Sequence, residues 1–116
     1  PAPGAPAPLL ADVTARTALG APHRENNDFV DFDRERLIPK LVSTEGPTLA
    51  VGDANGDGRD DLYVGGAKEQ AGQLLLQRAD GTFAPGDSTP FVEDAIAEDV
   101  GAAFLDADGD GDQDLY

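Results

Sequence analysis

Residues 53–61 read "DANGDGRDD". Asp or Asn stands at four of the five odd-numbered positions, and glycines stand at positions 4 and 6. The same pattern returns 53 residues later as "DADGDGDQD", residues 106–114. Because Asp, Asn and Gly favour turns, one such stretch alone could be an acidic turn that water solvates. Two copies in phase favour a repeated cation-binding loop.

The spacing of the oxygen-bearing residues suits calcium. This hard cation takes six to eight oxygen ligands, and a chain supplies several of them by curling around the ion. The pattern predicts side-chain ligands at positions 1, 3, 5 and 9 and a backbone carbonyl at position 7. These are Asp53, Asn55, Asp57 and Asp61 with the carbonyl of Arg59, and Asp106, Asp108, Asp110 and Asp114 with the carbonyl of Asp112. Gly58 and Gly111, at position 6, permit the positive-φ turn that folds each loop back.

Residues after the loop exclude the helical calcium motifs. An EF-hand needs a bidentate Glu at position 12 of its loop and helices on both sides. Position 12 is Val64, and Gly65 and Gly66 follow it. A dockerin-like loop fails on the same residues, so a loop between two strands remains.

Short apolar runs separated by Gly-rich turns predict strands around the first loop. The runs are 48–51, 62–66, 73–77 and 81–83, and none reaches helix length. They predict a four-stranded antiparallel meander. Combined with a repeat of 53 residues, the meander predicts an all-β fold of propeller blades, each with a calcium-binding loop. Tyr63 and Tyr116 recur in phase and are expected to pack between blades.

The stretch "LAVGDANGDGRDDLYVGG", residues 49–66, resembles the FG-GAP repeat of integrin-type β-propellers, also known as the VCBS repeat. Residues 23–53 resemble the segment that precedes such repeats in large secreted bacterial proteins of the ASPIC and UnbV type. The resemblance implies that the loop joins the first two strands of a blade, and that calcium bound at the ten positions named above stabilises the blade. It also implies a secreted or cell-surface protein, with an outer-membrane or periplasmic location included.

The resemblance and the composition divide the chain into four parts. Residues 1–8 are a Pro/Ala-rich linker, 9–45 an irregular lead-in, 46–102 a first blade and 103–116 the start of a second. Propellers close with about four to eight blades. We therefore expect an incomplete fragment whose remaining blades belong to a longer chain.

Apolar residues in the lead-in predict a short helical turn or an irregular packed segment. They are Phe29, Phe32, Leu37, Ile38 and Leu41. Pro39 interrupts any longer helix there.

Composition excludes several classes of function. The net charge of −15 argues against nucleic acid and anionic membrane surfaces as partners. No apolar run approaches the roughly 18 residues of a membrane span. The chain has no Cys and one histidine, His23, so a zinc site or a Cys-His pair is excluded within it. His23 is expected to be an exposed loop residue.

The sequence thus predicts a calcium-binding, non-catalytic module that acts in adhesion or in binding a protein or glycan at the cell surface. The alternative is the propeller scaffold of a secreted polysaccharide-degrading lyase or hydrolase, with His23 as the candidate base.

Overall fold

The computed structural model describes residues 9–19, 23–25, 30–40 and 44–116. The predicted linker, residues 1–8, lies outside the described residues, as do Phe29 and Leu41 of the predicted lead-in.

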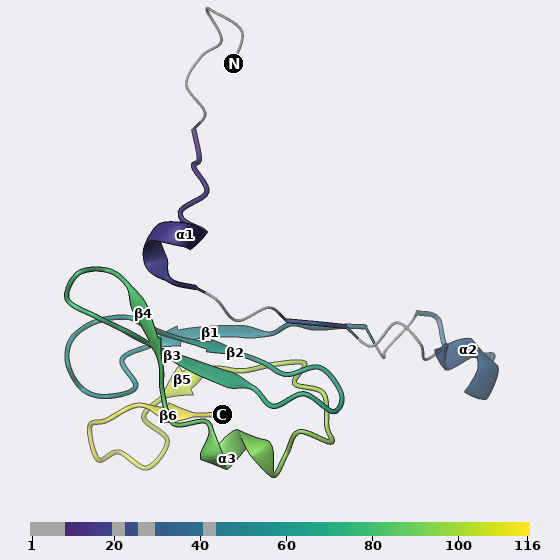
Figure 1. Ribbon diagram of the computed structural model, residues 1–116. Coiled ribbons are helices and arrows are strands. Elements are labelled where there is room, and N and C mark those ends of the chain that lie inside the picture. Colours follow the sequence, from purple (N-terminus) through teal and green to yellow (C-terminus); the bar gives the residue numbers. More distant parts are fainter. Residues whose placement is uncertain (1–8, 20–22, 26–29, 41–43) are drawn as a thin grey trace, which may run out of the picture.

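Four strands form the main sheet (Figure 1). They are β1 (Leu49–Gly52), β2 (Asp61–Val64), β3 (Gln73–Gln77) and β4 (Phe83–Pro85), paired antiparallel in chain order. The predicted meander is confirmed, with small shifts in strand boundaries. Each strand is a short apolar run, and a connection that contains glycine follows it. Runs of this length favour strands over helices.

A second, two-stranded sheet repeats the first hairpin. It consists of β5 (Phe104–Leu105) and β6 (Asp114–Leu115), and β5 lies beside β1. The pair Leu105 and Asp114 occupies the register that Gly52 and Asp61 occupy in the main sheet. The repeat seen in the sequence is therefore a repeat in space, and the structure is mostly β, with the four-stranded antiparallel sheet of a propeller blade.

The helices are single turns: α1 (Thr14–Thr17), α2 (Asp31–Arg34) and α3 (Thr89–Val92). Figure 1 shows α2 at the end of an extended arm, away from the sheet. Phe32 lies in α2, so the predicted short helical turn is present; Phe32 is 41% exposed and Leu37 98% exposed, so neither side chain is packed in a core. None of the helices in the described ranges has the length and hydrophobicity that a membrane crossing needs.

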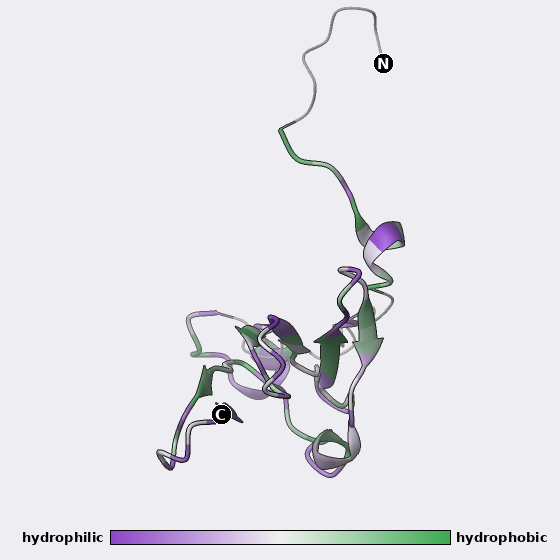
Figure 2. Ribbon diagram, turned by 90° about the vertical axis from the view of Figure 1, so that its left-hand side faces the viewer, coloured by the Kyte–Doolittle hydropathy of each residue, from purple (hydrophilic) through white to green (hydrophobic). Residues whose placement is uncertain are grey.

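The apolar core is small. Its buried members are Ala50, Tyr63, Ala67 and Leu75. Successive side chains of a strand point to opposite faces, so Ala50 and its cross-strand partner Tyr63 lie on one face. Figure 2 shows hydrophobic residues on the strands and hydrophilic ones in the connections. Burying so few large side chains leaves much of the stability to hydrogen bonds and to the loops.

Asp99 fastens the connection between the two sheets to β2. Its Oδ2 accepts hydrogen bonds from the Tyr63 hydroxyl (2.8 Å) and from the Gly66 amide (2.7 Å). The Tyr63 ring packs against Phe91 of α3, with ring centroids 5.0 Å apart. Burial raises the pKa of the Tyr63 phenol, and the hydrogen bond and charge of Asp99 raise it further. Tyr63 therefore stays neutral, and its hydroxyl donates a hydrogen bond to Asp99.

Tyr63→Phe should lower the free energy of unfolding by about 1–2 kcal/mol, because Asp99 loses one of its donors. Tyr116→Phe is the matched control: Tyr116 is 89% exposed, so its loss should change stability by less than about 0.5 kcal/mol. Urea denaturation at fixed calcium measures both. Equal effects of the two substitutions would contradict this role of the Tyr63 hydroxyl.

Candidate metal-binding loops

Both acidic loops connect the strands of an antiparallel pair, β1 with β2 and β5 with β6. At position 6 of each loop the chain turns back through a positive φ, +80° at Gly58 and +96° at Gly111. L side chains rarely adopt this conformation, which is why glycine stands there. The predicted turn at position 6 is confirmed.

The first carboxylate of each loop accepts the amide of the turn glycine. The Gly58 amide donates to Asp53 Oδ2 at 2.8 Å, and the Gly111 amide donates to Asp106 Oδ2 at 3.2 Å. In both loops the side chain at position 3 accepts from the amide at position 5, and position 5 accepts from position 7, at 3.0–3.2 Å. The loops share these hydrogen bonds and differ at Oδ1 of the first carboxylate, which accepts the Asp57 amide in the first loop and the Gly109 amide in the second.

The carboxylate at position 9 closes each loop. Asp61 is 0% exposed; its Oδ2 accepts from the Ala54 amide (3.1 Å) and its Oδ1 from the Gln77 amide of β3 (2.7 Å). In the second loop the Ala107 amide donates to Asp114 Oδ2 at 2.9 Å. Asp61 therefore ties the first loop to two strands of the main sheet.

Three predicted ligands of the second loop converge. Asp106, Asp108 and Asp114 each place a carboxylate oxygen within 4.8 Å of the other two, and all three are exposed. Like charges at this separation repel one another, and a bound cation would offset that repulsion. Hard carboxylate oxygens fit calcium, so these residues could hold it.

The other two predicted ligand positions of the second loop interact with each other. The Asp112 amide donates to Asp110 and holds the pKa of the Asp110 carboxyl below its usual range. The hydrogen bond and the negative charge of Asp110 raise the pKa of the Asp112 side chain. The predicted ligand at position 7 is the Asp112 carbonyl, and it stays a prediction.

The first loop has a different charge arrangement. Arg59 donates through Nη2 to Asp57, forming an ion pair, and through Nε to the Gln77 carbonyl at 2.9 Å. Within the described residues, the three-carboxylate group occurs in the second loop and not in the first. Of the ten predicted ligand residues, the structure therefore brings the carboxylates of three together in one group.

His23 is not the exposed loop residue that was expected. Its side chain is 12% exposed, with Nδ1 3.2 Å from the Gly65 carbonyl and Nε2 2.7 Å from Glu25 Oε1. Sequence could not reveal this, because Gly65 lies 42 residues further along the chain. The histidine holds residues 23–25 against the blade.

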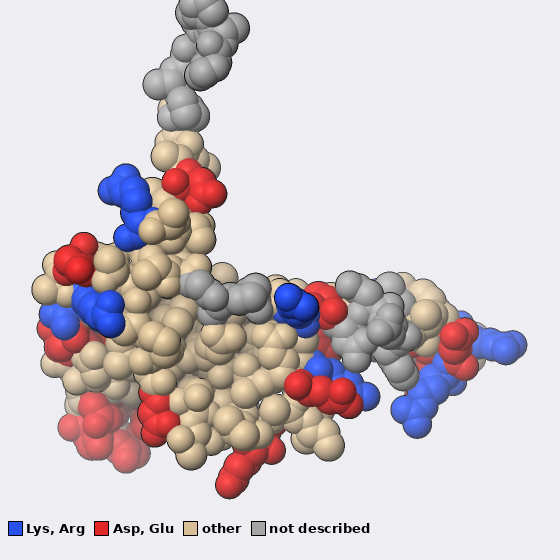
Figure 3. Space-filling view, in the orientation of Figure 1, with Lys and Arg blue, Asp and Glu red and all other residues tan. Residues whose placement is uncertain are grey.

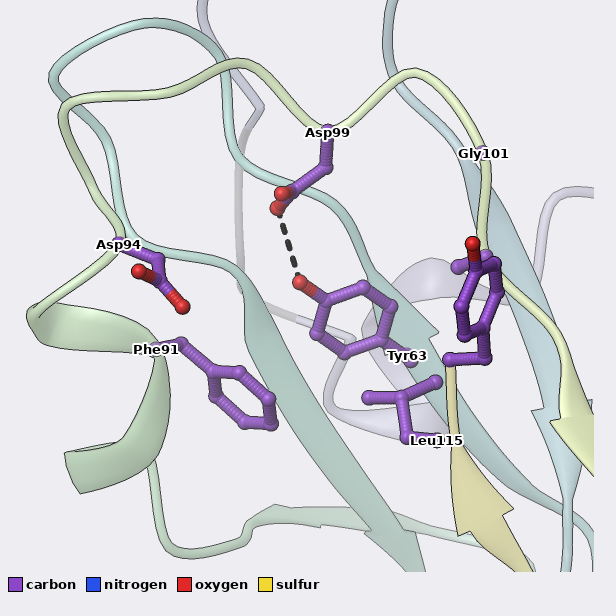
Figure 4. Close-up of a pocket in the computed structure, with 8 residues that line it drawn as sticks. Tyr63, Phe91, Asp94, Asp99, Gly101 and Leu115 are labelled. Carbon is purple, nitrogen blue, oxygen red and sulfur yellow. Dashed lines mark hydrogen bonds between the residues drawn. The ribbon is translucent and has the colours of Figure 1, made fainter. Parts of the chain in front are cut away.

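A cavity of about 200 Å³ marks the joint between the two repeats (Figure 4). Figure 4 shows Tyr63 and Phe91 on one side and Leu115 of β6 on the other, with Asp94 and Asp99 at its rim. The in-phase tyrosines both line it, although Tyr116 is 89% exposed.

A family model described as an FG-GAP-like repeat matches residues 53–116, more than half of the chain. The chain belongs to the FG-GAP-like repeat family. Neither the curated proteins nor the solved structures that were compared with it gave a match. The matched region begins at the first loop and extends through the second, so both loops are part of the FG-GAP-like repeat.

Two polar residues of this FG-GAP-like region were missed at the level of sequence. Asp99 binds the Tyr63 hydroxyl, and Gln113 Oε1 accepts the Asp53 amide at 2.7 Å. Gln113 stands at position 8 of the second loop, where Asp60 stands in the first. The recurrence of an acceptor side chain at this position, outside the ligand pattern, is the signal that could have identified it.

The pH dependence of stability should reveal the hydrogen bonds of Asp53. The Gly58 amide, more than the other amides around the carboxylate, lowers the Asp53 pKa. A group with a lowered folded-state pKa contributes stability above its unfolded pKa, about 3.9, and loses that contribution as pH falls through the folded pKa. In chelator, Asp53→Asn should therefore melt below wild type at neutral pH, and the difference should shrink below about pH 4.

The control is Asp60→Asn, which changes an exposed carboxylate of the same loop. Its melting temperature should follow that of the wild type through the acid range. A constant difference between wild type and Asp53→Asn from neutral to strongly acidic pH would refute the assignment.

Proposed function

We propose that this FG-GAP-like repeat binds calcium in its two loops and acts outside the cell as a non-catalytic module that binds a protein or glycan. The observation that carries the proposal is the convergence of the carboxylates of Asp106, Asp108 and Asp114. They lie in a loop whose hydrogen bonds match those of the first loop, within the residues matched to the family.

The donor set favours calcium over softer metals. Carboxylate and carbonyl oxygens suit calcium, magnesium or manganese, whereas thiolate and imidazole suit zinc and copper. The chain has no Cys, and the ring nitrogens of His23 already face the Gly65 carbonyl and the Glu25 carboxylate. Magnesium requires near-ideal octahedral geometry, while calcium accepts the irregular surroundings of an exposed loop.

Calcium would act in this module as a structural ion. The buried apolar core is small and the net charge is −15, so cations in the loops would reduce self-repulsion where it is most concentrated. Figure 3 shows a dense group of acidic side chains in the region that the β5–β6 loop occupies in Figure 1. We propose that calcium in each loop stabilises the two strands that the loop connects.

The second loop is proposed to bind more tightly than the first. It offers four carboxylates at side-chain ligand positions against three in the first loop, and calcium affinity rises with ligand charge. In addition, the Arg59 guanidinium competes for Asp57 in the first loop.

An extracellular or cell-surface location is proposed because calcium sites of extracellular modules have dissociation constants of roughly 0.1–1 mM, which need abundant calcium. The nearest partners are proposed to be further blades of a longer propeller. Leu49 and Val51 of β1 are 63% and 58% exposed, and a blade packed on that face would bury them.

Calcium should raise the melting temperature, and a chelator should lower it. At free calcium one hundred times the dissociation constant, the gain in the free energy of unfolding is about 2.7 kcal/mol per site.

Asp108→Ala should weaken calcium binding at the second site about tenfold or more, because it removes one of three converging charges. Asp33→Ala, an exposed carboxylate in α2, is the control and should leave calcium binding unchanged. Calorimetric titration and thermal melts measure these effects; melting that ignores calcium would sink the metal assignment.

The non-catalytic role can be separated from the polysaccharide-degrading alternative by an activity assay. Incubation with acidic and neutral polysaccharides in calcium should release no new reducing ends or unsaturated products. Turnover that His23→Ala abolishes would instead establish the enzyme. Glu25→Gln serves as the control, because it weakens the same contact of the histidine without removing the imidazole.

A further inference from the structure

The two loops are joined by one side chain. Gln113, at position 8 of the second loop, accepts through Oε1 the backbone amide of Asp53, the first residue of the first loop, at 2.7 Å. This is a contact between residues 60 positions apart in the chain. It links the start of one candidate site directly to the interior of the other.

The backbone of β1 has no room for a side chain at this contact. A Cβ built on Gly52 would lie 2.5 Å from Gln113 Oε1 and 2.5 Å from the ring of Phe104. Real Cβ atoms essentially never approach this closely, so glycine is what allows β5 and Gln113 to reach β1. The joint consists of an apolar contact from Phe104 and a directed hydrogen bond from Gln113.

We propose that Gln113 is a positioning residue that couples calcium binding in the two loops, so that an ion in the second loop raises the affinity of the first. The proposal rests on the calcium function proposed above. Gln113 lies between Asp112 and Asp114, two predicted ligand positions of the second loop. An ion held there restricts the backbone on both sides of Gln113 and keeps its side chain on the Asp53 amide.

The effect on the first loop follows from the bonds of Asp53. Its carboxylate accepts the amides of Asp57 (2.9 Å) and Gly58 (2.8 Å), so the orientation of Asp53 fixes the turn of the loop. Holding its amide reduces the freedom that the loop loses when it binds an ion. By linkage the coupling is reciprocal: the first ion raises the affinity of the second loop by the same factor.

Position 8 carries an acceptor in both repeats, Asp60 in the first and Gln113 in the second. Neither residue belongs to the predicted ligand set. An acceptor at this position suits the role of bonding to the loop of a neighbouring repeat.

The test is a calcium titration of each loop followed by NMR. The amides of Gly56 and Gly58 report the first loop, and those of Gly109 and Gly111 report the second. Gln113→Ala should weaken calcium binding in the first loop about twofold to tenfold, the range expected for one hydrogen bond.

The matched control is Gln70→Ala. Gln70 also accepts a backbone amide through its side-chain oxygen, from Arg24 at 3.2 Å, but lies outside both loops. Its removal should leave both calcium affinities unchanged.

Coupling is separated from simple stabilisation by a double-mutant cycle. Asp108→Ala, which weakens calcium binding in the second loop, should also weaken calcium binding in the first loop when Gln113 is present. The same substitution should have no further effect there in the Gln113→Ala background. Independent effects of the two substitutions on first-loop affinity would overturn the coupling while leaving calcium binding intact. If neither loop of the wild type binds calcium, the coupling and the proposed function both fail.

Discussion

Asp61 carries a carboxylate that is fully buried at the end of the first loop, and it bonds to backbone amides from two different segments. Leaving a buried carboxylate without partners costs several kcal/mol, so the loop must close around it and β3 must lie beside it. The orientation of the loop, and with it of Asp53 and Asp57, depends on this residue. In the second loop Asp114 makes the equivalent bond to Ala107 but also joins the converging carboxylates.

The small core makes the joint between repeats important. In the part of the chain that the structure describes, the buried apolar residues are Ala50, Tyr63, Ala67 and Leu75. They bury less area than a larger domain uses for its stability. Side-chain hydrogen bonds hold the two repeats together as well. Asp99 bonds to Tyr63 of β2, and Gln113 bonds to the Asp53 amide of the first loop. Loops that place carboxylates close together are compatible with folding because backbone amides donate to those carboxylates, and the proposed cations would offset the remaining charge. Stability and the proposed metal binding thus depend on the same residues.

Much of the blade could be predicted from local pattern. The strands around "DANGDGRDD" follow from short apolar runs, and the glycines at position 6 follow from the φ that the turn requires. The exposure of Phe32 and Leu37 was not predicted, because apolar character does not tell whether another part of the protein lies close enough to pack against. The prediction that His23 is exposed was wrong, because the Gly65 carbonyl that it contacts is distant in the chain.

The repeat can be read directly from the residue order, and the loop residues and the strand, loop, strand order follow from spacings of a few residues. Tertiary structure decided which carboxylates converge. Asp57 is paired with Arg59 and Asp61 with backbone amides, while Asp106, Asp108 and Asp114 face one another. It also decided that Gln113 touches Asp53. Such contacts depend on how two hairpins pack, and packing is a property of the folded chain that no short spacing encodes.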